Sequence, residues 1–269
     1  QPRNLLIRHI MMPTPKSNRK LTSAQKQILK QWIAEGAKWG RHWAFEPVRR
    51  PAVPAGARHP IDAFVRAKLA EKKIQPAPRA TPETLARRLH LDLTGLPPEH
   101  DAGDAAPSAG GHADYTALVE KLLASQHFGE RWAWDWLDAA RYADSNGYQG
   151  DPERTMWPWR DWVVRAINDN MPYDQFTIWQ LAGDLLPDAT SEQRLATGFN
   201  RNHMINGEGG RIAEETRVEN VMDRVETTAT VWLGITMSCS KCHDHKFDPV
   251  TMRDYYALYD VFNQTSEDG

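Results

Sequence analysis

Both cysteines of this 269-residue chain lie in one short stretch, Cys239-Ser240-Lys241-Cys242-His243. Two thiols separated by two residues, with a histidine directly after the second, form the pattern C-x-x-C-H. Each thiol in this pattern can add across one vinyl group of a porphyrin, and the imidazole can coordinate the iron. The stretch therefore predicts covalent attachment of a haem c through Cys239 and Cys242, with His243 as the proximal iron ligand.

A second ligand for the iron would come from elsewhere in the chain. His203 and Met204 lie in the polar, glycine-rich segment Asn202–Gly210, which could fold over a haem face. A distal methionine favours electron transfer at higher potential, a histidine lowers the potential, and an open position permits small-molecule chemistry. We expect His203 or Met204 as the distal ligand, with an open position as the alternative. A hydrogen-bonded loop histidine is the simplest other interpretation of His203.

The residues directly after the motif could assist it. His245 lies too close to His243 in sequence to reach the far side of the iron, but it could bind a propionate, carry a proton or ligate another metal. Asp244 and Asp248 flank His245 and could orient its ring. The alternative for Asp248 is a turn or cap residue before Pro249, a role that aspartates commonly have.

Composition excludes some classes of protein. The formal net charge is −2 and charged residues make up 25% of the chain, so the sequence shows no broad nucleic-acid footprint. No run approaches the roughly 18 apolar residues that a membrane span needs. The chain contains eleven tryptophans, which favour either a core or the walls around a flat cofactor.

Helical periodicity runs through most of the chain, without βαβ alternation or hairpin signals. The pattern predicts a mainly α fold, a multi-helix domain with long polar loops. Thr81 followed by Pro82 predicts a helix start, and Gly95 predicts its end. A long helix is predicted to run from about Ala213 to the motif, which would place the two thiols and His243 three and four residues apart on neighbouring faces. The β-branched run from Thr227 to Val231 leaves a strand possible there.

The first forty residues have a different character. Met12 precedes a proline, and a polar loop then leads to an amphipathic helix that Thr22 would cap. This order resembles the C-terminal half of a small class I cytochrome c module, here truncated. The resemblance implies Met12 as an axial ligand of that module's haem, with Met11 as the rival, whereas both are ordinary core residues in the alternative interpretation. A proline-rich linker is expected at 41–58 and the main domain at 59–265.

Several segments of the main domain resemble the planctomycete-type cytochrome c family over about residues 58–263. The matching segments are His59-Pro60-Ile61-Asp62-Ala63-Phe64, Leu91-Asp92-Leu93-Thr94-Gly95-Leu96-Pro97, Arg141-Tyr142-Ala143-Asp144-Ser145-Asn146-Gly147, Asp174-Gln175-Phe176, Gln180-Leu181-Ala182-Gly183-Asp184, Ala196-Thr197-Gly198-Phe199, Asp223-Arg224-Val225 and Cys239 to Pro249. The resemblance implies a large exported bacterial protein that carries haem, in which a cytochrome c module precedes this domain and a further domain follows.

Three functions follow as expectations. The first is a periplasmic or otherwise exported c-type haem protein that passes electrons to a redox partner protein or to adjacent domains of the full-length chain. The second is an enzyme, either a haem-dependent oxidoreductase or a domain that acts on a polymer. The third is a structural zinc site held by Cys239 and Cys242, with His243 or His245 and a fourth ligand from elsewhere.

Overall fold

The computed structural model describes residues 21–265 except 39, 41–42, 58, 99–111 and 149. Its regular elements in these ranges are helices, and the described residues contain no β-strand, only an isolated bridge between Ser145 and Glu153. The predicted mainly α fold is therefore confirmed. The chain divides into two compact units, Gln1–Ala77 and Pro78–Gly269.

The first unit contains α2 (Ser23–Ala34), the short 3-10 helix η2 (Trp43–Phe45) and α3 (Pro60–Glu71). Thr22 caps α2 as the sequence predicts. Its hydroxyl accepts the Gln25 N–H, and the Gln25 side-chain oxygen accepts the Thr22 N–H. Met11 and Met12 lie outside the described residues, so the cytochrome-like tail stays a prediction.

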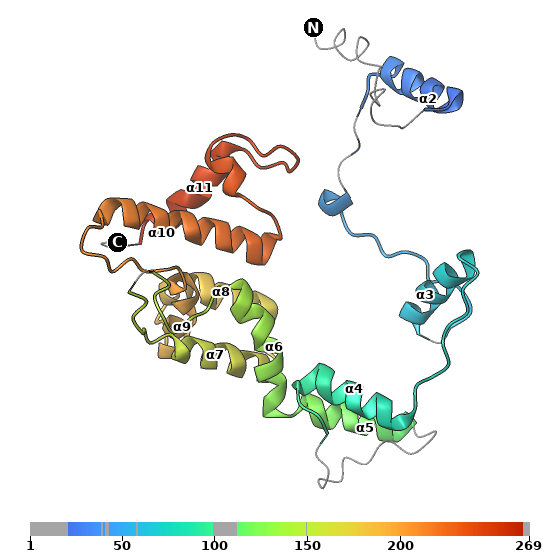
Figure 1. Ribbon diagram of the computed structural model, residues 1–269, viewed down its shortest axis with the longest axis horizontal. Helices are drawn as coiled ribbons and strands as arrows, with labels where there is room; N and C mark the ends of the chain where they lie inside the picture. The colour runs from blue at the N-terminus through green and yellow to red at the C-terminus, as the bar shows by residue number, and fades with distance from the viewer. Residues whose placement is uncertain are drawn as a thin grey trace. The chain divides into compact units, whose positions relative to one another are not determined.

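The second unit carries the remaining helices (Figure 1). They are α4 (Pro82–Thr94), α5 (His112–Leu123), α6 (Gln126–Ala139), α7 (Trp157–Asn168), α8 (Tyr173–Ala182), η3 (Gly183–Leu185), α9 (Ser191–Ala196), η4 (Thr197–Arg201), α10 (Ala213–Thr228), η5 (Ala229–Leu233), η6 (Ser238–Lys241) and α11 (Met252–Asn263). The predicted boundaries of α4 are confirmed, because Thr81 is its N-cap and Gly95 ends it with φ of 72°.

The largest core of the second unit lies among α6, α7, α8 and α9. Trp159, Trp162, Phe176 and Phe199 are buried in it, together with small residues such as Ala133. The indole N–H of Trp159 donates to the Ala196 carbonyl at 3.0 Å, so this buried ring is satisfied. Other tryptophans are exposed, so the tryptophans of this chain lie on the surface as well as in the core. The exposed ones among the described residues are Trp43, Trp132, Trp134 and Trp157.

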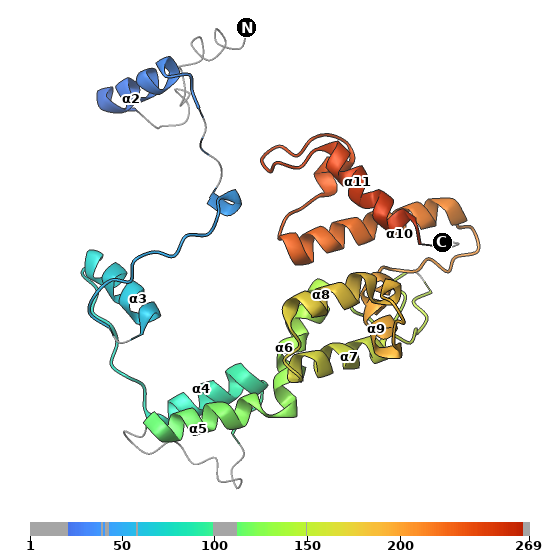
Figure 2. The same ribbon diagram turned by 180° about the vertical axis from the view of Figure 1, so that it is seen from behind.

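A second core forms where α10 packs against α11, which lie side by side in both views (Figures 1 and 2). Val221 and Val225 of α10 and Tyr255 and Phe262 of α11 are buried there. Met237, just before η6, is 4% exposed and completes this core. The segment that leads into the cysteines is thus fixed by apolar packing.

The long helix does not reach the motif, and this part of the sequence prediction is wrong. After Thr228 the chain forms the π-helical turn η5, and Gly234 then adopts a left-handed conformation with φ of 62°. This conformation ends a helix and is readily accessible to glycine. The β-branched run at 227–231 remains helical instead of forming a strand, because the α10 packing overrides its local preference.

Gly129 allows α6 and α7 to approach closely. A Cβ at this position would lie 2.5 Å from the Val164 carbonyl oxygen and 2.6 Å from Asn168 Cγ. The Gly129 N–H also donates to Asn168 Oδ1 at 2.7 Å. We expect Gly129→Ala to lower the free energy of unfolding by about 1–3 kcal/mol, because the overpacking outweighs the better helix propensity of alanine.

The measurement is urea denaturation, with Gly150→Ala as the matched control. The nearest atom to a Cβ at Gly150 is Pro152 Cδ at 3.8 Å, so this variant should match the wild type. A Gly129→Ala variant as stable as the wild type would show that the two helices can separate without cost.

The first turn of α11 should make stability depend on pH. The Thr251 N–H and hydroxyl both donate to Asp254 Oδ2, at 2.8 and 2.7 Å, and these bonds lower the pKa of Asp254 below its ordinary value. The carboxylate therefore stabilises the folded state above the unfolded-state pKa of about 3.9, and this contribution is lost as pH falls through the lower folded-state pKa. Asp254→Asn should be less stable than the wild type at pH 7, and the two should converge at low pH in urea titrations. A difference that stayed constant down to pH 2 would contradict this role.

Candidate functional site

The two cysteines lie on a short helical turn of their own. The Cys239 carbonyl accepts the N–H groups of Cys242 and His243, both at 3.4 Å, so the turn begins at the first cysteine and closes at the histidine. Both cysteines are exposed free thiols. The helical separations expected from the sequence are therefore present, although η6 and not the end of α10 provides them.

His243 is held in one tautomer. Its Nδ1 lies 2.8 Å from the backbone oxygen of Asp244. Because a carbonyl oxygen can only accept, Nδ1 carries a proton, and in the neutral ring Nε2 then carries the lone pair. The side chain is exposed. A histidine whose Nδ1–H donates to a backbone carbonyl presents Nε2 to a metal in the orientation common among metal ligands.

The motif turn is fixed to α11 by polar contacts as well as by Met237. Ser240 is fully buried, and its hydroxyl donates to the Val250 carbonyl at 3.4 Å. The Tyr256 hydroxyl of α11 donates to the Lys241 carbonyl at 3.1 Å. These bonds fix the backbone between the two cysteines while their thiols stay accessible.

His245 closes the loop that follows the motif. Its N–H donates to the Val250 carbonyl at 2.8 Å, and its Nδ1 accepts the N–H groups of Asp248 at 2.8 Å and Phe247 at 3.3 Å. Asp248 Oδ2 also lies 3.3 Å from Nδ1. Since Nδ1 accepts two N–H bonds, it carries no proton for that carboxylate, and we regard the contact as proximity and not as an ion pair. The His245 side chain is only 11% exposed.

Asp244 has a different position from the one expected. Its Oδ1 accepts the N–H of Met252, the first residue of α11, at 2.9 Å. A carboxylate on this amide satisfies a helix donor that has no intrahelical partner and favours the positive end of the helix dipole. The prediction that Asp244 orients the His245 ring is therefore corrected, because this carboxylate caps α11 instead.

A carboxyl group and a phenol lie beside the motif. Tyr255 is fully buried, and its hydroxyl has no hydrogen-bond partner among the described residues. Burial raises the pKa of Tyr255, and the nearby Glu226 and Cys242 contribute in the same direction. Burial also raises the pKa of Glu226, whereas the ammonium of Lys241 acts to lower it. The environment beneath the turn is thus poorly hydrated and disfavours added negative charge.

His203 lies within a buried network instead of facing an open space. It is 4% exposed, its Nδ1 donates to the Met204 carbonyl at 2.9 Å, and its Nε2 accepts from Arg224 Nη2 at 3.0 Å. Arg224 of α10 also donates to the Asn200 carbonyl at 2.8 Å. Both ring nitrogens are engaged, so a distal role for His203 would require Arg224 to leave Nε2. Met204 is 55% exposed and lies against Gly147.

Sequence reasoning missed Arg154, which joins two loops. Its guanidinium donates to the carbonyls of His203 at 2.7 Å and Asn202 at 3.3 Å, and its Nε donates to the Ala143 carbonyl at 3.2 Å. Arg154 lies in an irregular segment, so no periodicity marked it as partly buried. The arginine sets the position of the glycine-rich loop relative to the Asp144 turn.

The Asp144 turn is itself a structural junction. The Tyr142 hydroxyl donates to Asp144, and the Met156 N–H donates to Asp144 Oδ1 at 3.0 Å. Burial and the Asp144 hydrogen bond raise the pKa of Tyr142 to about 12. Arg141 pairs with Asp223 of α10, which connects the end of α6 to the helix beneath the motif.

In the described part of the chain, no group of three or more histidine, cysteine, aspartate or glutamate side chains is placed to hold a metal ion. Within the same ranges, no helix is both long and apolar enough to cross a bilayer.

Comparison with known proteins corrects the family that the sequence suggested. The model of one family, PSCyt2, matches residues 60–267, and it is described as a protein of unknown function (DUF1549). This match supports no cytochrome c family and no haem-attachment motif, so the resemblance to the planctomycete-type cytochrome c family is wrong as an assignment. No curated protein and no solved structure matched the chain. Because the match covers well over half of the sequence, the chain belongs to the DUF1549 family of proteins of unknown function.

Proposed function

We propose that Cys239 and Cys242 attach a haem c covalently and that His243 is its proximal iron ligand. In this proposal the chain is an exported electron-transfer protein, and its partner is a redox protein or an adjacent domain of a longer chain. The proposal depends on the motif and its geometry in this chain, because the family has no assigned function.

The main support for the proposal is the arrangement of His243 and the two thiols. The Nδ1–H of His243 donates to the Asp244 carbonyl at 2.8 Å, which leaves Nε2 as the nitrogen for a metal, and the same helical turn carries two exposed free thiols. Attachment requires both thiols to be accessible and an imidazole with an unprotonated nitrogen on the same side of the backbone. Two exposed thiols and an exposed histidine within one turn occur only here, since the chain has no other cysteine.

The surroundings of the motif also fit a porphyrin. Phe247 is 82% exposed and Leu233 is 60% exposed, so apolar side chains that a flat ring could cover lie close in the sequence on both sides of the motif. Lys241 and Lys246 are exposed cations beside the motif that could pair with carboxylates. A haem c bound there would supply reversible one-electron transfer.

The chain's own residues would keep the ligand in place during electron transfer. The Asp244 carbonyl fixes the orientation of the His243 ring. The bonds from Ser240 to Val250 and from Tyr256 to Lys241 hold the turn at constant spacing. A rigid ligand turn limits rearrangement when the charge at the site changes.

The first prediction concerns covalent attachment. The chain, expressed in the periplasm of a host with haem-attachment machinery, should keep haem staining after denaturing electrophoresis. Cys239→Ser and Cys242→Ser should each keep one thioether and give a red-shifted reduced pyridine haemochrome, and the double variant should lose the stain. An unstained wild-type chain that holds zinc at one ion per molecule would reject the haem proposal and favour the zinc site.

The second prediction separates the ligand role of His243 from a general structural effect. In the haem-loaded protein, His243→Ala should keep the covalent stain but change the axial ligation, seen as a shift of the Soret band and of the iron spin state. His127→Ala is the matched control, because His127 is exposed on α6 and pairs with Glu130. Spectra that stay the same in His243→Ala would remove His243 as the proximal ligand.

The third prediction concerns His203. Because both of its ring nitrogens are engaged, we expect His203→Leu to leave the haem spectrum unchanged and to lower the free energy of unfolding by about 1–3 kcal/mol, the cost of a lost buried hydrogen bond. Paired absorption spectra and urea denaturation test both parts. Loss of a low-spin spectrum in His203→Leu would instead assign His203 as the distal ligand.

A further inference from the structure

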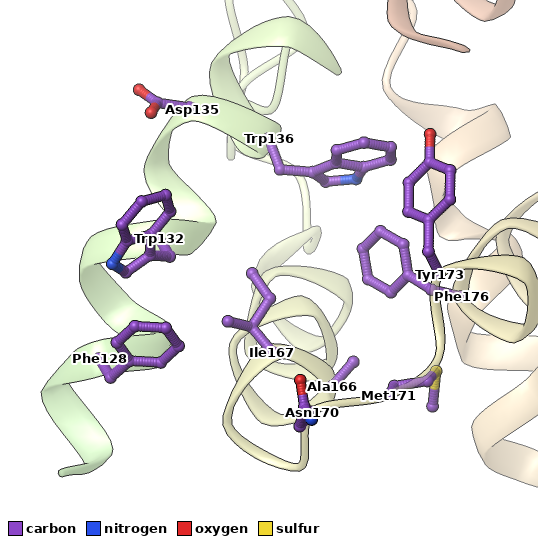
Figure 3. A pocket seen from close by; sticks show the side chains of 10 residues that line it. All are labelled: Phe128, Trp132, Asp135, Trp136, Ala166, Ile167, Asn170, Met171, Tyr173 and Phe176. Carbon is purple, nitrogen blue, oxygen red and sulfur yellow. The ribbon is translucent and has the colours of Figure 1, made fainter. Parts of the chain in front are cut away.

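An apolar pocket opens between α6 and the segment that joins α7 to α8 (Figure 3). It encloses about 510 Å³, which falls within the size range of small-molecule sites. None of its lining residues belongs to the cysteine motif or to the Arg154 and His203 network. The pocket is therefore a separate feature of the second unit.

Aromatic side chains form two opposing walls. On one side the rings of Phe128 and Trp132 lie 5.8 Å apart with an interplanar angle of 35°. On the other side Trp136 and Phe176 meet edge to face at 4.9 Å, beside the exposed ring of Tyr173. Figure 3 shows Ile167 between the two groups of rings. Opposing aromatic walls suit a flat ring system better than a bulky one.

The wall that contains Trp136 is rigid before any ligand binds. The Trp136 indole N–H donates to Gln180 Oε1 at 3.0 Å, and Gln180 is fully buried. Phe176 stacks on the buried Trp162 at 5.5 Å. The close approach at Gly129 fixes the spacing of α6 and α7. A preformed wall lowers the ordering cost of binding.

The charge of the lining restricts the ligand. None of the described residues that line the pocket is a lysine, arginine or histidine, and the one ionisable carboxylate is Asp135. Figure 3 shows the Asp135 carboxylate directed away from the rings. An anionic ligand would thus find no counter-charge and one repulsive carboxylate near the opening. A neutral ligand would meet only apolar walls, the Tyr173 hydroxyl and the Asn170 amide.

We propose that this pocket is a binding site for a small, flat, uncharged aromatic molecule of about two or three rings. The ligand lies between the Trp132 wall and the Trp136 wall, with its polar edge toward Tyr173 and Asn170. This site is independent of the haem proposal and requires no cofactor at the cysteine turn.

The test uses two probes with the same carbon skeleton, neutral N-phenyl-1-naphthylamine and its anionic sulfonate, 8-anilino-1-naphthalenesulfonate. Fluorescence titration of the full chain should give saturable binding of the neutral probe. The sulfonate should bind at least tenfold more weakly, because taking its charge out of water is unfavourable without a partner. Equal affinity for the two probes, or no saturable binding of the neutral one, would overturn the proposal.

Variants locate the binding in the pocket. Trp132→Ala and Tyr173→Ala remove rings from opposite walls, and each should weaken binding of the neutral probe about fivefold. Trp134→Ala is the matched control, because Trp134 is 70% exposed on the same helix and does not line the pocket. Trp132 and Tyr173 are 48% and 61% exposed, so circular dichroism and thermal melts should match those of the wild type. Equal weakening in Trp134→Ala would show adsorption to surface tryptophans and would reject the site.

Discussion

The packing of α10 against α11 is the constraint on which the candidate site depends. Val225 and Tyr255 are fully buried in this contact, and Met237 joins them from the segment just before the cysteines. Burial of side chains of this size contributes about 1.5–3 kcal/mol each, more than any single polar bond at the turn. The thiols can remain exposed because the backbone before them is fixed by the packing of Met237 in the core between α10 and α11. Two exposed thiols on an anchored backbone are therefore both accessible and fixed in position.

The same helix connects the motif to the rest of the second unit. Asp223 of α10 pairs with Arg141, Arg224 bonds the Asn200 carbonyl and His203, and Glu226 lies near Lys241. Residues within a single turn of α10 therefore interact with the end of α6, with η4 and the loop after it, and with the cysteine turn. Arg224 is the buried member of this group, so its guanidinium depends on these partners to satisfy its hydrogen bonds.

Local signals in the sequence predicted what depends on neighbouring residues. The caps at Thr22 and Thr81 and the end of α4 at Gly95 are confirmed, because a hydroxyl acceptor and a left-handed glycine act within one turn. The helical spacing of Cys239, Cys242 and His243 is also present, since it follows from a single turn.

The sequence could not predict what depends on tertiary contacts. Periodicity continued through Gly234, so the helix end there was missed. The sequence allows Asp244 to orient His245, whereas the position of α11 brings the Asp244 carboxylate to the Met252 N–H. His203 looked available because the partner of its Nε2, Arg224, lies 21 residues away on α10. Arg154 was overlooked for a similar reason, since its carbonyl partners come from loops distant in sequence.

The central claim is that one histidine and two thiols on a single anchored turn hold a covalent haem. Intact-protein mass spectrometry of the chain, purified under denaturing conditions from a periplasm with haem-attachment machinery, tests it most directly. The account predicts a mass increase of one haem per chain, and peptide mapping should place it on the fragment that contains Cys239 and Cys242. A chain with the mass of the bare polypeptide, both thiols free to alkylation, would contradict the account.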